Sequence, residues 1–203
     1  LASGDSVRGD HHVSARRRLA AIKVGGGLAP IPGALDLVCA AIREAGRSVP
    51  IVVVPGGGPF ADAVRAFGRT HQLSADAAHW MALLAMDQYA HALVERIEGA
   101  TLVEDAGSVA GAANPAGVVV LAPSRWMRAA DVLPHTWDAT SDSVAAFVAG
   151  ALDADHLVLV KPSVSGNDVV DRCFFSVLPA GLRYTLLPWN RAGELPGILA
   201  SPA

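Results

Sequence analysis

Residues 133–146 concentrate side chains that could do chemistry. Residues 133–142 alone hold two aspartates, three hydroxyls, a histidine and a tryptophan, and an apolar run of small residues follows. Thr140 or Ser141 is suited to cap the helix predicted to begin there, which places Asp142 in its first turn. Because the N-terminus of a helix attracts anions, this segment is a candidate site for a phosphate or for organising a metal ion.

A lysine and a glycine loop form a second candidate group. Residues 19–24 predict a short buried strand that contains Lys23 and ends at Gly25, Gly26 and Gly27. A lysine in such a strand needs an anionic partner, and the glycine N–H groups can form an anion-binding nest. No Gly-Lys-Ser/Thr follows, so this is not a P-loop. A tight turn beside a snorkelling lysine is the plainer alternative.

Two later strands end in similar residues. The apolar run 51–54 predicts an interior parallel strand that stops at Gly56, Gly57 and Gly58, before a helix through residues 60–67. The run 156–160 predicts another buried strand, and Lys161 follows it directly. Ligands of open α/β sheets bind at the carboxyl ends of the strands, so we expect these loops to meet there.

The remaining pattern completes a three-layer α/β/α sandwich around a mainly parallel sheet. A helix is expected over residues 74–97, strands over 101–103 and 118–123, and an edge strand over 184–187. His79, Trp80, Asp87 and Gln88 lie near the apolar stripe of that helix and fit either a substrate pocket or a subunit interface. Residues 106–115 are expected to be a flexible connection and the C-terminal residues a loose tail. We predict a disordered lead-in over residues 1–17 and one domain over 18–203.

Composition narrows the classes of partner. The chain has 203 residues, of which 52% are hydrophobic and 17% charged, and its net charge is −3. This charge argues against nucleic acid as a partner, and no apolar run reaches the roughly 20 residues of a membrane span. Two cysteines make neither a disulfide framework nor a metal site, and Cys39 is expected to be buried. A reducing cytoplasm is the expected compartment. His11 and His12 could bind metal, but a tail without structure is the simpler interpretation.

The order of the motifs resembles the amino acid kinase superfamily, which includes acetylglutamate kinase, aspartokinase, uridylate kinase and the molybdenum storage protein. The motifs are Lys-x-Gly-Gly-Gly, Pro-Gly-Gly-Gly-Pro-Phe, Trp-Asp-x-Thr-Ser-Asp-Ser-x-Ala-Ala and Leu-Val-Leu-Val-Lys-Pro. The resemblance covers roughly residues 19–190. Residues 78–89 and 133–138 look most like the branch of aminomethylfuran-methyl phosphate kinases of methanofuran biosynthesis.

The resemblance implies an ATP-dependent kinase of the amino acid kinase fold, with magnesium accompanying the ATP. Lys23 would hold the transferred phosphoryl group, and Asp142 matches the aspartate that orients the catalytic lysines. Gly25, Gly26 and Gly27 would wrap the ATP phosphates, while Gly56, Gly57 and Gly58 would face the acceptor. Thr140 and Ser141 would contact the acceptor or the transferring phosphate, and His135 and Trp137 are assigned to the acceptor side. No residue is assigned as a protein ligand of a metal.

The sequence also departs from this family. Many relatives carry Thr-Asp at the end of the late strand, where this chain has Val160 and Lys161. No convincing match to the nucleotide loop with a second lysine is found. Lys161 is therefore expected to serve the ATP phosphates and the catalysis; the alternative is that ATP binding is altered or lost. Arg65 and Arg125 are weaker candidates for an acceptor phosphate, and for each a plain surface arginine is favoured.

The expected reaction transfers the γ-phosphoryl group of ATP to a small phosphate monoester, aminomethylfuran-methyl phosphate, and forms a diphosphate. One alternative is a uridylate kinase-like enzyme, in which Trp80 or Trp137 could stack a pyrimidine. The other is a non-catalytic assembly subunit that binds nucleotide or oxoanions. A homo-oligomer is expected, possibly with a related subunit.

Overall fold

The computed structural model describes residues 18–112, 117–166 and 169–201. The predicted lead-in over residues 1–17, with His11 and His12, lies outside the described residues. The predictions for residues 18–201 are compared with the structure below, except at residues 113–116 and 167–168.

The centre of the described structure is one sheet of six strands, in the order β3-β4-β2-β1-β5-β6. Every neighbouring pair is parallel, which agrees with the predicted α/β class. The strands are β1 (Ala20–Val24), β2 (Ile51–Pro55), β3 (Thr101–Val103), β4 (Val118–Leu121), β5 (His156–Lys161) and β6 (Arg183–Pro188).

The register of the three central strands brings their carboxyl ends together. Lys23 of β1 lies between Val54 of β2 and Leu159 of β5. Val24 is level with Pro55 and Val160, so the loops after β1, β2 and β5 leave the sheet side by side. These are the three loops that the sequence assigns to phosphate chemistry.

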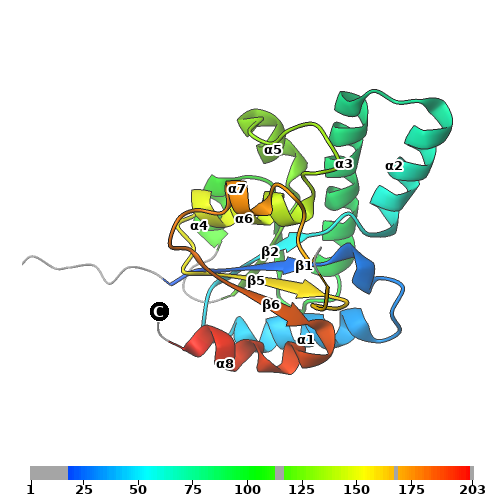
Figure 1. Cartoon of the computed structure of the whole chain (residues 1–203). Coiled ribbons are helices and arrows are strands. Elements are labelled where there is room, and N and C mark those ends of the chain that lie inside the picture. Colours follow the sequence, from blue (N-terminus) through cyan, green and yellow to red (C-terminus); the bar gives the residue numbers. More distant parts are fainter. Residues whose placement is uncertain (1–17, 113–116, 167–168, 202–203) are drawn as a thin grey trace, which may run out of the picture.

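Helices cover both faces of the sheet, and the alternating side chains of the strands explain why (Figure 1). Ile51 and Val53 belong to one buried cluster, and Val52 and Val54 belong to another on the opposite face. The first cluster joins α1 (Ala34–Ala45), η2 (Trp189–Glu194) and α8 (Leu195–Ala200). The second joins α4 (Ala106–Ala112), α5 (Ser124–Ala130), α6 (Ser141–Ala151) and α7 (Phe174–Val177). The three-layer prediction is confirmed.

Two long helices stand beside the layers, namely α2 (Gly58–His71) and α3 (Ala75–Val94), as Figure 1 shows. The side chain of Ser74 caps α3 by accepting the N–H of Ala77 at 3.2 Å, close to the predicted start. Leu83 joins one buried cluster and Leu93 joins the other, so α3 passes the edge of both layers. Together the two helices form one wall of the pocket described below.

Two segments differ from their predicted loop character. Residues 106–112 form α4, because the carboxylate of Asp105 accepts the N–H of Ser108 at 2.8 Å and starts a helix; residues 113–115 lie outside the described part. The C-terminal residues form η2 and α8 instead of a loose tail, since Ala192, Leu195 and Leu199 are buried against α1. The predicted strand over 118–123 ends at Leu121, and α5 follows it.

We predict that His156 makes the fold acid-sensitive. Burial, with a smaller contribution from Arg183, lowers the pKa of His156 to about 4, and its Nε2 lies 2.8 Å from Thr185 Oγ1. The unfolded chain binds this proton at the ordinary histidine pKa, so the stabilisation is complete above that value and is lost as the pH falls towards 4. The loss reaches about 3 kcal/mol. Urea unfolding of His156→Leu between about pH 7.5 and 4.5 should show a flatter dependence on pH. The exposed His91→Leu should retain the wild-type slope, and an equal slope in both variants would contradict the assignment.

Candidate functional site

Two lysines share one carboxylate at the carboxyl ends of the central strands. Lys23 Nζ lies 2.8 Å from Asp142 Oδ1, and Lys161 Nζ lies 2.5 Å from Asp142 Oδ2. All three side chains are buried. They are brought together from β1, β5 and the first turn of α6. Because Lys23 and Lys161 are the two lysines of the whole sequence, every lysine of this chain is at this site.

The charges of this group influence one another. Burial raises the pKa of the Asp142 carboxyl, but Lys23 and Lys161 outweigh burial and hold that pKa below its usual range. Burial and the neighbouring charge of Lys23 lower the pKa of Lys161, against the attraction of Asp142. Asp142 is therefore an anion at neutral pH, and its two ammonium partners leave the group with an excess of positive charge. Such an excess suits a phosphate ligand.

Asp171 holds the start of α6 in place, a role that was not predicted from the sequence. Its carboxylate accepts the N–H of Thr140 at 2.9 Å and the N–H of Ser143 at 3.0 Å. It also accepts the hydroxyls of Thr140, at 2.8 Å, and of Ser143. The N–H of Asp171 donates to Asp142 Oδ2 at 3.2 Å. Of the two residues predicted to cap α6, Thr140 is the N-cap and Ser141 is the first residue of the helix, but the carboxylate of Asp171 satisfies the N–H groups in place of a local side chain.

We predict that Asp171→Asn disturbs the lysine pair. The negative charge of Asp171 raises the pKa of Lys161, so its removal should lower that pKa further. The weaker anchoring of α6 should also cost about 1–2 kcal/mol of stability. With two lysines in the chain, lysine-selective ¹⁵N labelling gives two side-chain signals whose titration can be followed. Asp138→Asn is the matched control, because Asp138 is paired with exposed Arg172 at 3.2 Å. An unchanged Lys161 titration in Asp171→Asn would limit Asp171 to a structural role.

The two glycine loops contact each other through their backbones. A Cβ atom at Gly26 would lie 2.3 Å from the nitrogen of Gly58, so no side chain fits there. Gly58 itself has a φ of +55°, in the left-handed region that favours glycine. The N–H of Gly25 donates to Val160 O at 3.0 Å, and the N–H of Gly56 donates to Val24 O at 2.8 Å. Each loop is therefore fixed to the end of a neighbouring strand, the loop after β1 to β5 and the loop after β2 to β1.

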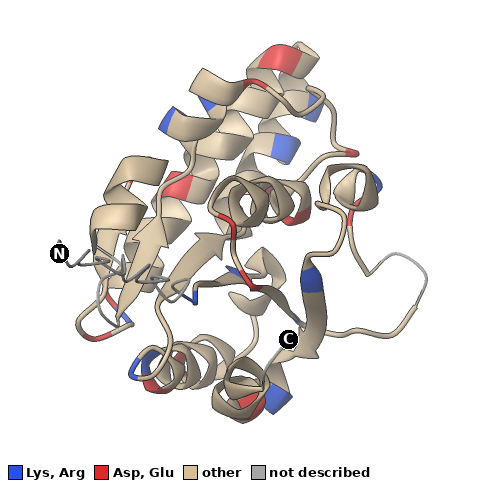
Figure 2. Cartoon of the chain, turned by 90° about the vertical axis from the view of Figure 1, so that its left-hand side faces the viewer, with Lys and Arg blue, Asp and Glu red and all other residues tan. Residues whose placement is uncertain are grey.

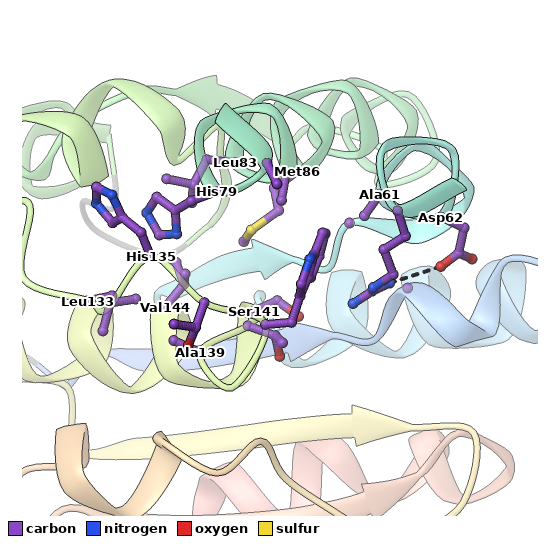
Figure 3. A pocket seen from close by; sticks show the side chains of 18 of the residues that line it. Ala61, Asp62, His79, Leu83, Met86, Leu133, His135, Ala139, Ser141 and Val144 are labelled. Atoms are coloured by element: carbon purple, nitrogen blue, oxygen red, sulfur yellow. Dashed lines mark hydrogen bonds and ion pairs between the residues drawn. The ribbon is translucent and has the colours of Figure 1, made fainter. Parts of the chain in front are cut away.

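A pocket of about 280 Å³ opens beside these loops (Figure 3). Eight predicted site residues line it, namely Gly26, Gly27, Gly57, Gly58, His135, Trp137, Thr140 and Ser141. Gly25 and Gly56 do not line it, and neither do the two lysines. Its apolar wall includes Leu83 and Met86 of α3, Leu133 and Val144. The structure thus separates a buried charged centre from an adjoining, largely apolar pocket.

His135 is held by two carboxylates. Its Nδ1 lies 2.7 Å from Asp76 Oδ1 and its Nε2 lies 2.9 Å from Asp131 Oδ1, and these contacts raise its pKa. Because carboxylates only accept, both ring nitrogens donate and the ring is an imidazolium. His135, which the sequence assigns to the side of the acceptor substrate, thus joins α3 to the end of α5. Beside it, the ring of His79 is stacked with centroids 4.2 Å apart.

Arg65 and His79 also line the pocket, although the sequence favoured a surface role for Arg65 and left His79 open. The guanidinium of Arg65 lies 4.3 Å from the centroid of the Trp137 ring and 2.9 Å from Asp62, an ion pair drawn as a dashed line in Figure 3. Arg125 is a surface arginine beside Glu104 at 3.3 Å. Arg65 and His79 become pocket residues because α2 and α3 pack opposite residues 133–144. Only the fold shows this arrangement.

Trp80 and Asp87 connect helices. Trp80 is outside the pocket lining, and Arg128 of α5 lies 4.4 Å from its ring centroid. Asp87 accepts the N–H of Ser124 at 2.9 Å and is also hydrogen-bonded to the hydroxyl of Ser124, so it fixes the start of α5 against α3. These contacts hold the frame of the pocket.

Residues 18–166 match the sequence profile of the amino acid kinase family. The chain belongs to the amino acid kinase family. A relative in Methanocaldococcus jannaschii, [5-(aminomethyl)furan-3-yl]methyl phosphate kinase, is 27% identical over 109 residues, which are 54% of this chain and 50% of that protein. The match therefore spans half the length of this curated relative.

Solved structures share the fold of this amino acid kinase family member. The UMP kinase of Bacillus anthracis has a TM-score of 0.64 at 12% identity and covers 90% of this chain and 91% of its own. The uridylate kinase of Archaeoglobus fulgidus has a TM-score of 0.55 at 18% identity, with 72% of this chain and 63% of its own covered. At such identities the likeness shows the fold alone.

The family match ends at residue 166, before Asp171. The anchoring of α6 by Asp171 therefore comes from a segment of this amino acid kinase family member that the profile does not reach. Elsewhere, the positions of positively and negatively charged residues are interspersed along the ribbon in the view of Figure 2. No helix in the described residues is both long and apolar enough to span a membrane.

Proposed function

We propose that the protein is an ATP-dependent kinase that phosphorylates a small phosphate monoester, [5-(aminomethyl)furan-3-yl]methyl phosphate, and forms a diphosphate. The observation that carries the proposal is the buried bridge of Lys23 and Lys161 on Asp142, next to a pocket for a small acceptor. The family supports phosphoryl transfer, and the relative in Methanocaldococcus jannaschii supports the acceptor.

The bridge suits the charge changes of phosphoryl transfer. Negative charge spreads over the oxygens of the transferred group, and catalysis consists mainly of positioning and neutralising it. Lys23 would contact the transferred phosphoryl group, while Lys161 would serve the phosphates of ATP in place of the missing second lysine loop. Asp142 would orient both ammonium groups. A phosphate acceptor has no proton that must be removed, so Asp142 need not act as a general base.

The glycine loops are suited to hold phosphate oxygens. Gly25, Gly26 and Gly27 would surround the ATP phosphates, and Gly56, Gly57 and Gly58 would face the acceptor. A Cβ atom at Gly26 would clash with the backbone of Gly58, so glycine at this position is what allows the two loops to lie against each other beside the pocket. Within the described residues, no group of three or more His, Cys, Asp or Glu side chains could hold a metal ion. We therefore propose that magnesium is held mainly by the ATP phosphates.

The polar side chains of the pocket favour a small acceptor over a nucleotide. Most of them already contact protein partners, namely Asp62, Arg65, His135, Thr136 and Thr140. UMP would bury a ribose diol and the polar edge of uracil with few groups left to pair them, and unpaired polar groups are costly. Trp137 and Met86 offer surfaces for a small planar ring. The uridylate kinase alternative rests on the shared fold, and the non-catalytic alternative rests on the missing second lysine loop.

ATP turnover should be measured with the furanmethyl phosphate, UMP and N-acetylglutamate offered in parallel. We expect a diphosphate product with the first acceptor and background rates with the other two. Turnover with UMP alone would favour the uridylate kinase alternative. Tight nucleotide binding without transfer to any acceptor would favour the non-catalytic subunit. The same preparation, analysed by light scattering, would test the proposed homo-oligomer.

A further inference from the structure

Three polar side chains of the pocket remain without a hydrogen-bond partner in the described part of the chain, namely His79, Trp137 and Ser141, and of these His79 can accept a hydrogen bond through a ring nitrogen. Ser141 is the first residue of α6, next to Asp142. His79 comes from α3 and is labelled beside His135 in Figure 3, on the opposite side of Ser141 from Ala61 and Asp62. An acceptor whose phosphate lies near Ser141 and the glycine loops would therefore direct its far end towards His79.

His79 is held as a neutral ring. Burial lowers its pKa first, and the imidazolium of His135, stacked at 4.2 Å, lowers it further against the opposing effects of Asp131 and Asp76. A neutral imidazole has one nitrogen that accepts a hydrogen bond. The charged groups around it are His135, Asp76 and Asp131, which together carry one excess negative charge. Arg128 lies over the ring of Trp80, which contacts the ring of His79 at an interplanar angle of 77°.

We propose that His79 is the specificity-determining residue of the acceptor site and accepts a hydrogen bond from the amino group of an amine-bearing aromatic phosphate ester. The inference rests on the proposed function and adds the residue that distinguishes this acceptor from esters without an amine. The accepting nitrogen of His79 receives a hydrogen bond from the ammonium group of the ligand. The net negative charge of His135, Asp76 and Asp131 together favours this ammonium group over a neutral substituent. The apolar side chains of Leu83 and Met86 line the pocket with it.

The inference differs from a role for His79 in the fold. A structural stacking role needs the flat ring and not its nitrogen, so phenylalanine should replace histidine without loss. A role in accepting a hydrogen bond needs the nitrogen, so phenylalanine should remove the preference for the amine and keep the affinity for the phosphate and ring. Glutamine, which has an acceptor oxygen, should restore part of that preference.

The test is calorimetric binding of two ligands to the whole chain: [5-(aminomethyl)furan-3-yl]methyl phosphate and the same ester without the aminomethyl group. The wild type should bind the amine ester about 10-fold more tightly. In His79→Phe this ratio should fall close to one, with the affinity for the second ester unchanged. His91→Phe, an exposed position on the same helix, should retain the wild-type ratio. The preference should also decrease as the pH falls below the ordinary histidine pKa and His79 takes up a proton.

The outcomes separate the two proposals. If the wild type binds both esters equally, or if His79→Phe keeps the 10-fold ratio, the role of His79 is overturned and the proposed acceptor class stands. If the wild type binds neither ester but binds UMP, the proposed function fails, and the role of His79 fails with it.

Discussion

Replacing Lys23 with methionine is expected to lower kcat for phosphoryl transfer by about 10²- to 10³-fold, because one preorganised charge that stabilises the transition state is lost. Methionine has nearly the length of lysine and is apolar, so it fits the buried position between Val54 and Leu159. The remaining pair of Lys161 and Asp142 keeps the carboxylate neutralised. The fold should therefore persist, and the loss should appear in kcat more than in the KM for the acceptor.

The measurement is steady-state turnover with the best acceptor from the parallel assay, together with circular dichroism and thermal unfolding. Arg43→Met is a suitable control, since Arg43 is an exposed cation on α1 paired with Glu98 at 2.5 Å. It should leave kcat unchanged. Turnover of Lys23→Met within a few-fold of the wild type would show that Lys23 has only a structural role.

The parallel sheet could be predicted because its strands are apolar runs with clear ends. Ile51 to Val54 has no polar residue, and a run buried on both faces is typical of an interior parallel strand. The segments that were predicted wrongly have weaker patterns. α4 is built largely from alanine and glycine, and its start depends on the contact of Asp105 with Ser108. The apolar residues of α8 are few and are interrupted by proline and glycine.

The charged centre could be predicted because each of its members stands at a position with a local signal. Lys23 and Lys161 lie in apolar strands, where a charge needs a partner, and Asp142 follows a capping residue. Asp171 has no such signal, since Thr140 and Ser143 are 31 and 28 residues away in the chain. The role of His135 depends on Asp131, four residues before it, and on Asp76, 59 residues before it in the chain. The contact with Asp76 is set by the fold and not by spacing.

The second large effect is expected for Asp142→Asn, which leaves two buried ammonium groups without their carboxylate. Removing one partner of a buried ion pair costs about 3 kcal/mol or more, because the remaining charge is desolvated and unpaired. In this variant the pKa values of Lys23 and Lys161 should fall well below that of an exposed lysine. Kinetically, kcat should fall as well, since neither ammonium group is oriented.

The stability of Asp142→Asn should depend on pH in a direction that the lysine pKa values determine. In Asp142→Asn the lysine pKa values of the folded state lie below those of the unfolded state. At a pH between the two values the unfolded chain binds more protons than the folded chain, so the stability of this variant should rise with pH through that range. At acidic pH the protonation of Asp142 in the wild type decides the difference in stability. The pKa of Asp142 is below its usual range in the wild type, so its stabilisation is present above the usual aspartate pKa and is lost as the pH falls through the lowered value. The difference between wild type and variant should therefore shrink in acid and also at alkaline pH.

Urea unfolding across the pH range, combined with the titration of the two lysine ¹⁵N signals, tests this directly. The double variant Lys23→Met with Asp142→Asn removes one of the stranded charges and should be more stable than Asp142→Asn alone. Such a non-additive result measures the coupling between the two side chains, as expected for groups in direct contact at 2.8 Å. Additive losses with unshifted lysine titrations would mean that Asp142 does not hold the lysines, and that the charged centre needs another organiser.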